Sequence, residues 1–272
     1  IIRNHTKVTD ESDAVFYFPG CGSERLFSQV GLATQAMLYE VGAITVLPPG
    51  YLCCGYPQTS SGDVEKGHEI SSDNRVQFHR IANTLNYLDI KTVIVSCGTC
   101  MDQLSKYQFE NIFPGCRLLD IHEYLLEKQV KMNNASGVKY MYHEPCHNPM
   151  KTYSSASVTS GLIGSDVPKN DRCCGESGTF AVTRPDIATQ VKMRKSEEII
   201  KGKQMISQSD NDQVKILTSC PSCLQGLSRY GDETGTDADY IVVEIAKSNL
   251  GENWLQDYVQ KANNGGIEKV LL

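Results

Sequence analysis

Ten of the eleven cysteines in this 272-residue chain follow a pattern that occurs twice. Each copy contains a single cysteine, an adjacent pair and a C-x-x-C pair, in that order. The members are Cys21, Cys53, Cys54, Cys97 and Cys100 in the first copy, and Cys146, Cys173, Cys174, Cys220 and Cys223 in the second. An odd total does not suit a closed set of disulfides, and adjacent cysteines rarely bridge each other. Thiolates that converge on a metal explain this pattern better.

The choice of metal follows from the number and type of ligands. Sites made only of thiolates suit zinc or iron–sulfur clusters. Structural zinc usually takes four ligands, whereas each copy of the pattern offers five. The C-x2-C-x2-C run of ferredoxins is absent. A lone cysteine would be read as a small buried residue, but ten cysteines in register favour metal binding. We therefore expect iron–sulfur clusters and keep zinc as the alternative.

The two copies are nearly equally spaced along the chain, which indicates an internal duplication. Corresponding cysteines lie 120–125 residues apart, and the flanking segments agree, CCGYPQTSSG with CCGESGTFAV and VIVSCGTCMDQL with KILTSCPSCLQGL. We predict two homologous domains, 1–133 and 134–272, joined at the polar stretch Lys131–Gly137. Glu123 and Glu244 also correspond, 121 residues apart; they could cap or orient loops, and no catalytic role is assigned to them.

Each half has the pattern of an α/β fold, with short β-rich runs alternating with segments of helical periodicity. The predicted strands are Ala14–Phe18, Ala43–Leu47, Thr92–Val95, Val138–Tyr142 and Val214–Thr218. Predicted helices carry Leu26, Val30, Ala33, Met37 and Val41, then Ile70, Ile81, Leu85 and Leu88, and then Pro185–Lys201. This alternation predicts two tandem Rossmann-like halves with mainly parallel sheets and right-handed crossovers, related by pseudo-twofold symmetry.

The single cysteines and the first cysteines of the C-x-x-C pairs are predicted to lie where strands end and helices begin. They are Cys21, Cys97, Cys146 and Cys220. Binding sites of open parallel sheets gather beyond the carboxyl ends of the strands. A thiolate at a helix N-terminus is also favoured by free N–H groups and the helix dipole. We therefore place both metal sites at these sheet edges.

Two histidines near the motifs have both a functional and an ordinary interpretation. His143 and His147 flank Cys146 and could tune a cluster by hydrogen bonding or assist proton transfer. They could equally be hydrogen-bonded histidines at the end of a strand. Cys116 lies outside the repeat and is expected to be a packed or surface thiol.

The composition excludes several classes of function. The net charge of -6 and the pI near 5.6 argue against a nucleic-acid partner, because phosphate binding needs a basic surface. No apolar stretch approaches the roughly 20 residues of a membrane-spanning helix, and no signal peptide is visible. The expected location is the cytoplasm, either free or peripheral on the inner face of a membrane. Because Ile1 is not an initiator methionine, the chain is expected to be a piece of a longer polypeptide.

The doubled cysteine motif resembles that of the CCG, or cysteine-rich, domain proteins. This family includes the cysteine-rich subunit of heterodisulfide reductase and the iron–sulfur subunits of glycolate and lactate oxidising enzymes. The segment Tyr142–Pro149, YHEPCHNP, is similar to the family's YHDPCH, with Glu144 in place of Asp. The resemblance implies up to one [4Fe-4S] cluster per half, which is noncubane in the heterodisulfide reductase members. Because some relatives hold another metal in one half, zinc in one half is also implied as an option.

The same resemblance suggests the C-terminal part of a fused FAD/iron–sulfur oxidoreductase. No dinucleotide fingerprint or P-loop occurs in the chain. FAD is therefore expected on a flavin-binding domain or subunit, accompanied by a ferredoxin-like domain. The isolated chain is then the iron–sulfur part of an enzyme rather than a complete one.

Three functions follow as expectations. The first is electron transfer in a flavin-linked 2-hydroxy-acid oxidoreductase of the glycolate or lactate type, from the flavin to an acceptor such as quinone. The second is reduction of a disulfide by the clusters themselves, as in heterodisulfide reductase. The third is a zinc-stabilised scaffold without redox activity.

Overall fold

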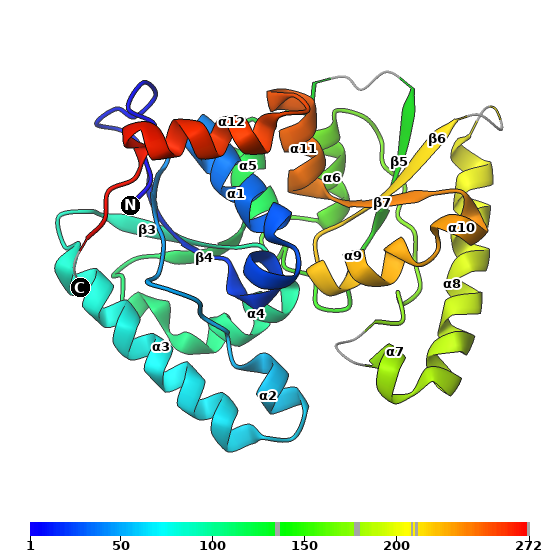
Figure 1. Cartoon of the computed structure of the whole chain (residues 1–272), viewed down its shortest axis with the longest axis horizontal. Helices are drawn as coiled ribbons and strands as arrows, with labels where there is room; N and C mark the ends of the chain where they lie inside the picture. The colour runs from blue at the N-terminus through cyan, green and yellow to red at the C-terminus, as the bar shows by residue number, and fades with distance from the viewer. Residues whose placement is uncertain (134–136, 177–179, 208, 210–211, 271–272) are drawn as a thin grey trace.

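The computed structural model describes residues 1–133, 137–176, 180–207, 209 and 212–270. The chain forms two α/β units that lie side by side, each built on its own sheet of parallel strands (Figure 1). Two tandem Rossmann-like halves with parallel sheets, as expected from the sequence, are therefore confirmed. Their relation by a pseudo-twofold axis stays a prediction.

The first sheet has the strand order β2-β1-β3-β4, and all of its strand pairs are parallel. Its strands are β1 (Ala14–Phe18), β2 (Ile44–Val46), β3 (Ile90–Val95) and β4 (Arg117–Asp120). β1 lies at the centre because its apolar residues are buried on both faces of the sheet. The three strands predicted for this half all occur, and β4 is an additional one.

The helices of the first unit connect these strands. They are η1 (Gly22–Leu26), α1 (Ser28–Glu40), α2 (Tyr56–Ser60), α3 (Val64–Thr84), α4 (Gly98–Leu104), η2 (Ser105–Tyr107), η3 (Phe109–Asn111) and α5 (Ile121–Glu127). The prediction of one continuous helix from Leu26 onward was wrong. Phe27 has a non-helical backbone (φ -130°, ψ 66°), so α1 begins only after it and Leu26 points to solvent with 70% of its surface exposed.

The second sheet has the order β5-β6-β7, again with parallel pairs. Its strands are β5 (Val138–His143), β6 (Gln213–Thr218) and β7 (Asp237–Tyr240). Where the first sheet has β2, the second has only an isolated parallel bridge between Tyr142 and Lys169. Residues 134–136 of the predicted joining stretch lie outside the described residues.

The helices of the second unit include α8, which is as long as α3 and holds the corresponding place. They are α6 (Ser155–Ile163), α7 (Phe180–Thr183), α8 (Pro185–Ile206), α9 (Pro221–Ser228), α10 (Gly231–Thr234), α11 (Ile241–Leu250), α12 (Trp254–Lys261) and η4 (Ala262–Gly266). Within the described residues, no helix combines the length and apolarity needed to cross a membrane.

Alternating side chains of β1 explain how the layers pack. Phe16 and Phe18 face α3 and pack against Phe78 in an outer core. Val15 and Tyr17 face the opposite way, into a central core shared by α1, α5, α6, α11 and both sheets. In Figure 1 these four helices lie between the two sheets, with α3 and α8 at the outer sides. The central core therefore holds the two units together.

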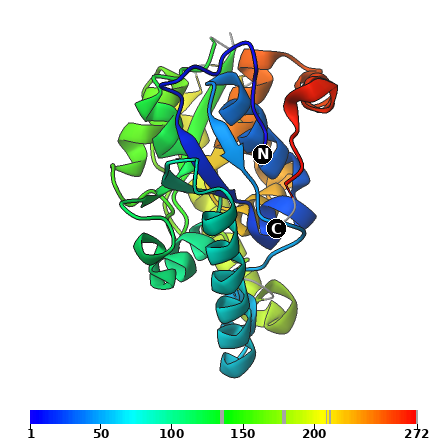
Figure 2. The same ribbon diagram turned by 90° about the vertical axis from the view of Figure 1, so that its left-hand side faces the viewer.

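The two ends of the chain meet beside the first unit. The Ile1 amino group donates to the Glu268 carbonyl at 2.8 Å, and Ile2 forms bridges to both Thr45 and Ile267. α12 crosses α1, and Figure 2 shows both termini on the same side of the molecule. Residues after 254 thus contact the first unit as well as the second. The division into 1–133 and 134–272 stays a prediction.

Candidate metal centre

The first-half cysteines converge at the carboxyl edge of the first sheet from three different segments. Cys21 follows β1 and precedes η1, while Cys97 follows β3 and caps α4, which carries Cys100. Cys53 and Cys54 come from the loop before α2. The location predicted from strand ends is where the structure places them. Three sulfurs are buried and the other two are half-buried.

The sulfurs of this half lie close to one another. The Sγ atoms of Cys21 and Cys53 are 3.9 Å apart, and Cys100 is the neighbour that most lowers the pKa of both Cys54 and Cys97. The Cys100 thiol holds the pKa of Cys54 well below its usual value, and the Cys54 thiolate raises the pKa of Cys100. Buried sulfurs that interact this closely can bind one metal together, because metal binding displaces the protons of the thiols.

Four of the five second-half cysteines form the same kind of cluster. Cys220 caps α9 directly after β6, and α9 carries Cys223. The Sγ atoms of Cys174 and Cys223 lie 3.4 Å apart, too far for the disulfide length of about 2.05 Å. Cys173, and next Cys223, lower the pKa of Cys174, whereas Cys174 raises the pKa of Cys223. Gly175 N–H donates to Cys173 Sγ at 3.4 Å.

Cys146 is the exception among the predicted ligands. Its side chain is exposed, and it contributes only a long-range charge effect on Cys173. The prediction that a helix begins after Cys146 was also wrong, because the next helix is α6 at Ser155. Pro149 disfavours a helical backbone at the residue before it, so the chain runs on irregularly. Metal binding by Cys146, as by the other nine cysteines, stays a proposal.

His143, rather than Cys146, lies beside the second cluster. The donor atoms of His143, Cys174 and Cys223 all lie within 4.8 Å of one another, and all three residues are buried. On its other side, His143 Nδ1 is 3.1 Å from Lys195 Nζ. Burial lowers the pKa of His143, which favours its neutral form. His143 therefore lies at Cys174 rather than at the neighbouring Cys146.

His147 links the two halves instead of contacting sulfur. Its Nδ1 is 2.5 Å from a carboxylate oxygen of Asp102 in α4, and its Nε2 is 3.3 Å from the hydroxyl of Tyr56. Lys151 Nζ contacts the other oxygen of Asp102 at 3.0 Å. Asp102 and Tyr56 were not singled out by the sequence analysis, because the contact joins residues far apart in the chain.

The two clusters meet at the boundary between the halves. Cys97 and Cys220, the first cysteines of the two C-x-x-C pairs, are neighbours across this boundary: next after Cys100, Cys220 lowers the pKa of Cys97, and Cys97 acts to raise the pKa of Cys220. The Tyr240 hydroxyl contacts both the Ser96 carbonyl (2.6 Å) and the Ser219 carbonyl (2.8 Å), which directly precede these cysteines. Nine of the ten repeat cysteines thus form one connected set of sulfurs.

Close backbone approach at this boundary requires glycine at one position. A Cβ added at Gly98 would lie 1.5 Å from the His147 carbonyl oxygen. The structural role of Gly98 is to let α4 approach the loop that contains Cys146.

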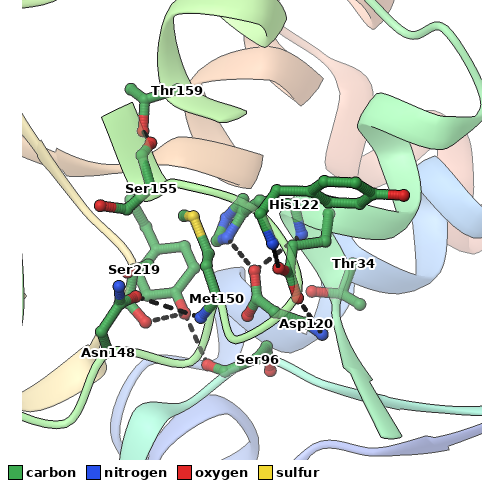
Figure 3. Close-up of polar contacts among 12 residues, drawn as sticks. Thr34, Ser96, Asp120, His122, Asn148, Met150, Ser155, Thr159 and Ser219 are labelled. Atoms are coloured by element: carbon green, nitrogen blue, oxygen red, sulfur yellow. Dashed lines mark hydrogen bonds and ion pairs between the residues drawn. The ribbon is translucent and has the colours of Figure 1, made fainter. Parts of the chain in front are cut away.

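A buried polar group lies behind this boundary. Asp120 and His122 are fully buried, and their side chains contact each other at 2.7 Å (Figure 3). Ser96 and Ser219 lie close to each other on one side of this pair in the same view, and Ser96 Oγ contacts the Tyr17 hydroxyl at 2.8 Å. The tyrosine hydroxyl contacts to Ser96 and Ser219 hold the backbone that leads into Cys97 and Cys220.

Contacts repeat between the halves at equivalent positions. Tyr107 donates to the Cys54 carbonyl at 3.0 Å, and Tyr230 donates to the Cys174 carbonyl at 3.0 Å. Likewise the Tyr142 hydroxyl contacts Ser219 Oγ, as Tyr17 contacts Ser96 Oγ. The duplicated sequence therefore builds duplicated support for the two adjacent-cysteine loops.

The remaining residues singled out from the sequence make structural contacts in the fold. Glu123 forms a capping box with Asp120 and accepts N–H groups from Thr152 and Tyr153, so it orients the loop after Cys146. Its counterpart Glu244 instead pairs with Lys215. Cys116 is half-buried against the outer core of the first unit.

Lys195 is another residue of the site that sequence reasoning missed. It is fully buried on α8, on the same face as Ala188 and Ile199. A signal was present, because the spacing of seven and four residues places this lysine on the apolar stripe of a helix. A charged residue on such a stripe needs a partner, and the second cysteine cluster lies next to it.

The donor set fits a thiolate-bound metal group. A tetrahedral site with metal–sulfur bonds of about 2.3 Å separates its sulfurs by about 3.8 Å, close to the 3.9 Å and 3.4 Å found here. Five sulfurs in one half, and four in the other with an imidazole beside them, suit an iron–sulfur cluster or zinc.

Comparison with known proteins adds relatives that share the motif. The chain is 28% identical over 218 residues to a subunit of the fumarate reductase (CoM/CoB) of Methanothermobacter marburgensis, covering 76% of this chain and 40% of that protein. It is 25% identical over 251 residues to the probable glycolate oxidase iron-sulfur subunit of Bacillus subtilis, covering 85% and 53%. Lactate utilization protein A of Exiguobacterium sp. is 24% identical over 204 residues, covering 68% and 80%.

The chain spans about half the length of the first curated relatives that it matches. A family model described as a domain of unknown function (DUF3400) matches residues 228–272. The model described as a cysteine-rich domain matches residues 15–105 and 140–228, which is most of the chain and includes both cysteine clusters. The chain therefore belongs to the cysteine-rich, or CCG, domain family.

Proposed function

We propose that this chain is the iron–sulfur electron-transfer part of a flavin-linked oxidoreductase of the glycolate or lactate type. The observation that carries the proposal is the connected set of buried sulfurs that runs through both halves and meets at Cys97 and Cys220. Redox-enzyme iron–sulfur subunits among the relatives support it. When bound, the clusters would supply one-electron transfer between the flavin and an acceptor such as quinone.

The residues of the chain have three tasks in this function. Cysteines at the strand ends would hold the clusters, and the N–H group of Gly175 donates to sulfur. Apolar side chains and the Tyr107 and Tyr230 hydroxyls bury and fix the adjacent-cysteine loops. The Cys97–Cys220 contact brings the two sites together, so an electron can pass between them without crossing solvent.

Partners follow from the same proposal. A two-electron cofactor is needed to take hydride from a 2-hydroxy acid, and the chain has no flavin fingerprint. We therefore assign FAD to a flavin-binding domain or subunit, accompanied by a ferredoxin-like domain.

Reduction of a disulfide is the second candidate, and one cavity favours it. A cavity of about 130 Å³ opens beside Cys174 and is lined also by Lys192 and Arg229. A small substrate could reach the second site there. The relative from the fumarate reductase (CoM/CoB) is consistent with chemistry of this kind. Zinc binding by His143, Cys174 and Cys223 would instead support the scaffold function.

The experiment that separates these functions compares the chain alone with the full oxidoreductase. With a 2-hydroxy acid and an artificial acceptor, turnover should appear only when the flavin-bearing part is present. Cluster-ligand variants should then block transfer to the final acceptor more than reduction of the flavin. Oxidation of the hydroxy acid by the chain alone would contradict the proposal. Rapid disulfide reduction by the chain and a simple reductant would favour the second candidate.

A further inference from the structure

The two halves differ at two positions that contact the clusters or their loops. His143 is the last residue of β5, and Phe18 is the last residue of β1, each three residues before the single cysteine of its half. Lys195 lies ten residues after Pro185, the first residue of α8; Asn74 lies ten residues after Val64, the first residue of α3. The first site thus has two neutral side chains where the second has an imidazole and an amine.

Asn74 has the supporting role expected of a neutral residue in its half. Its Nδ2 donates to the Cys53 carbonyl at 2.7 Å and to the Tyr107 hydroxyl at 3.1 Å. Phe18 packs against Phe78 in the outer core. Neither side chain adds charge to the first site.

Lys195 is held by neutral acceptors only in the described part of the chain. Its Nζ contacts Asn170 Oδ1 (2.5 Å), the Asn170 carbonyl (3.2 Å), the Asp171 carbonyl (2.5 Å) and His143 Nδ1 (3.1 Å). Three of these contacts are to oxygen acceptors, one more than the two N–H groups of a neutral amine could serve. The contacts therefore fit the positively charged ammonium form of Lys195.

The contact with Lys195 sets the tautomer of His143. An ammonium group has only hydrogen-bond donors, so Nδ1 must accept and the ring proton must lie on Nε2. Nε2 is buried without a hydrogen-bond partner in the described structure. Cys174 and Cys223 are the acceptors near the ring, since their sulfurs lie within 4.8 Å of its donor atom.

We propose that Lys195, acting through His143, is a positioning residue that makes the second-half metal site the more easily reduced of the two. This inference rests on the proposed function, that both sites hold iron–sulfur clusters. An added electron is stabilised by a buried positive charge and by an N–H group aimed at sulfur. Electrons then run from the first half to the second, and the second half is the end that delivers them.

Other cations near the sites do not remove this asymmetry. Arg25 near the first site is exposed, so solvent screens its charge. At the second site Arg229 is paired with Glu176 at 2.9 Å, and Lys192 lies 3.8 Å from Glu233. Lys195 is the buried cation without a paired carboxylate within the described residues.

The test replaces the second-half residues by those of the first half. Lys195→Asn and the double variant His143→Phe/Lys195→Asn should each lower the higher of the two midpoint potentials, measured by anaerobic EPR-monitored redox titration. We expect at least a tenfold change in the redox equilibrium, which is about 59 mV for a one-electron couple. The lower potential should stay unchanged. Arg194→Asn, which removes an exposed charge from the adjacent position, should move neither potential, and Lys195→Arg should largely restore the higher one.

Each failure has a distinct meaning. Absence of iron and sulfide from the unmodified protein would overturn the proposed function itself. Two clusters whose potentials respond equally, or not at all, would overturn only this inference. Loss of the second cluster from both Lys195 variants, with Arg194→Asn fully loaded, would show a purely structural role and contradict the proposal. Loss of metal in a His143→Phe single variant would make His143 a ligand rather than a donor and would also contradict it.

Discussion

Cys97 and Cys220, the N-caps of the equivalent helices α4 and α9, lie close enough across the boundary between the two halves for each to act on the pKa of the other. Beside them, Gly98 lets α4 approach the His147 backbone, where a Cβ would lie 1.5 Å from the carbonyl oxygen. The proximity of Cys97 and Cys220 converts two separate cysteine clusters into one continuous set. Substitutions of the cysteines should change the metal content, whereas substitutions at the boundary should change the free energy of unfolding.

Loss of a buried central sulfur should affect its own half. Cys54→Ser is expected to remove or convert the first-half cluster and to spare the second, because Cys54 contacts both Cys53 and Cys100. Cys116→Ser is the matched control, since Cys116 lies outside the repeat. Iron per chain and the EPR signal of each cluster are the measurements. Equal iron loss from both variants would make Cys116 a ligand.

Cys146 should matter less than the other cysteines of its half. Its sulfur is exposed, and its removal leaves Cys173, Cys174, Cys220 and Cys223, as many thiolates as a common cubane cluster uses. We expect Cys146→Ser to keep most of its iron while its EPR spectrum changes, whereas Cys174→Ser loses the cluster. Iron loss from Cys146→Ser as large as that from Cys174→Ser would show that the loop closes onto the metal.

These two predictions show which features of the site can be predicted from the sequence. The repeat predicted which cysteines cluster and at which sheet edge, because strand ends and residue spacing are local properties. The exposure of Cys146 depends on the irregular chain around Pro149. The His147–Asp102 contact joins residues 45 positions apart, which periodicity does not predict. Lys195 was within reach of sequence reasoning, because it interrupts an apolar stripe.

Gly98→Ala should destabilise the boundary between the halves. The new Cβ would meet the His147 carbonyl at 1.5 Å, so backbone on one side must move. We expect the free energy of unfolding to fall by about 1–3 kcal/mol or more, measured by urea titration. Gly231→Ala is the control, because its Cβ would meet the Thr236 carbonyl only at 3.3 Å. Similar unfolding midpoints for the two variants would argue against the close approach.

Tyr240→Phe tests the polar contact behind the clusters. The single hydroxyl proton is shared between two buried carbonyls, those of Ser96 and Ser219, and its loss leaves both without this shared donor. We expect a loss of about 1–3 kcal/mol in the free energy of unfolding. Tyr87→Phe, at an exposed tyrosine, should change little. If Tyr240→Phe and Tyr87→Phe had the same free energy of unfolding, the Tyr240 hydroxyl would not join the halves.

The central claim is that the repeated cysteines hold iron–sulfur clusters. The most direct measurement is iron, acid-labile sulfide and zinc per chain in protein purified without exposure to oxygen. The account predicts iron and sulfide in near-equal amounts, sufficient for a cluster in each half, with a broad visible absorption that bleaches on reduction. Stoichiometric zinc without sulfide in both halves would contradict it.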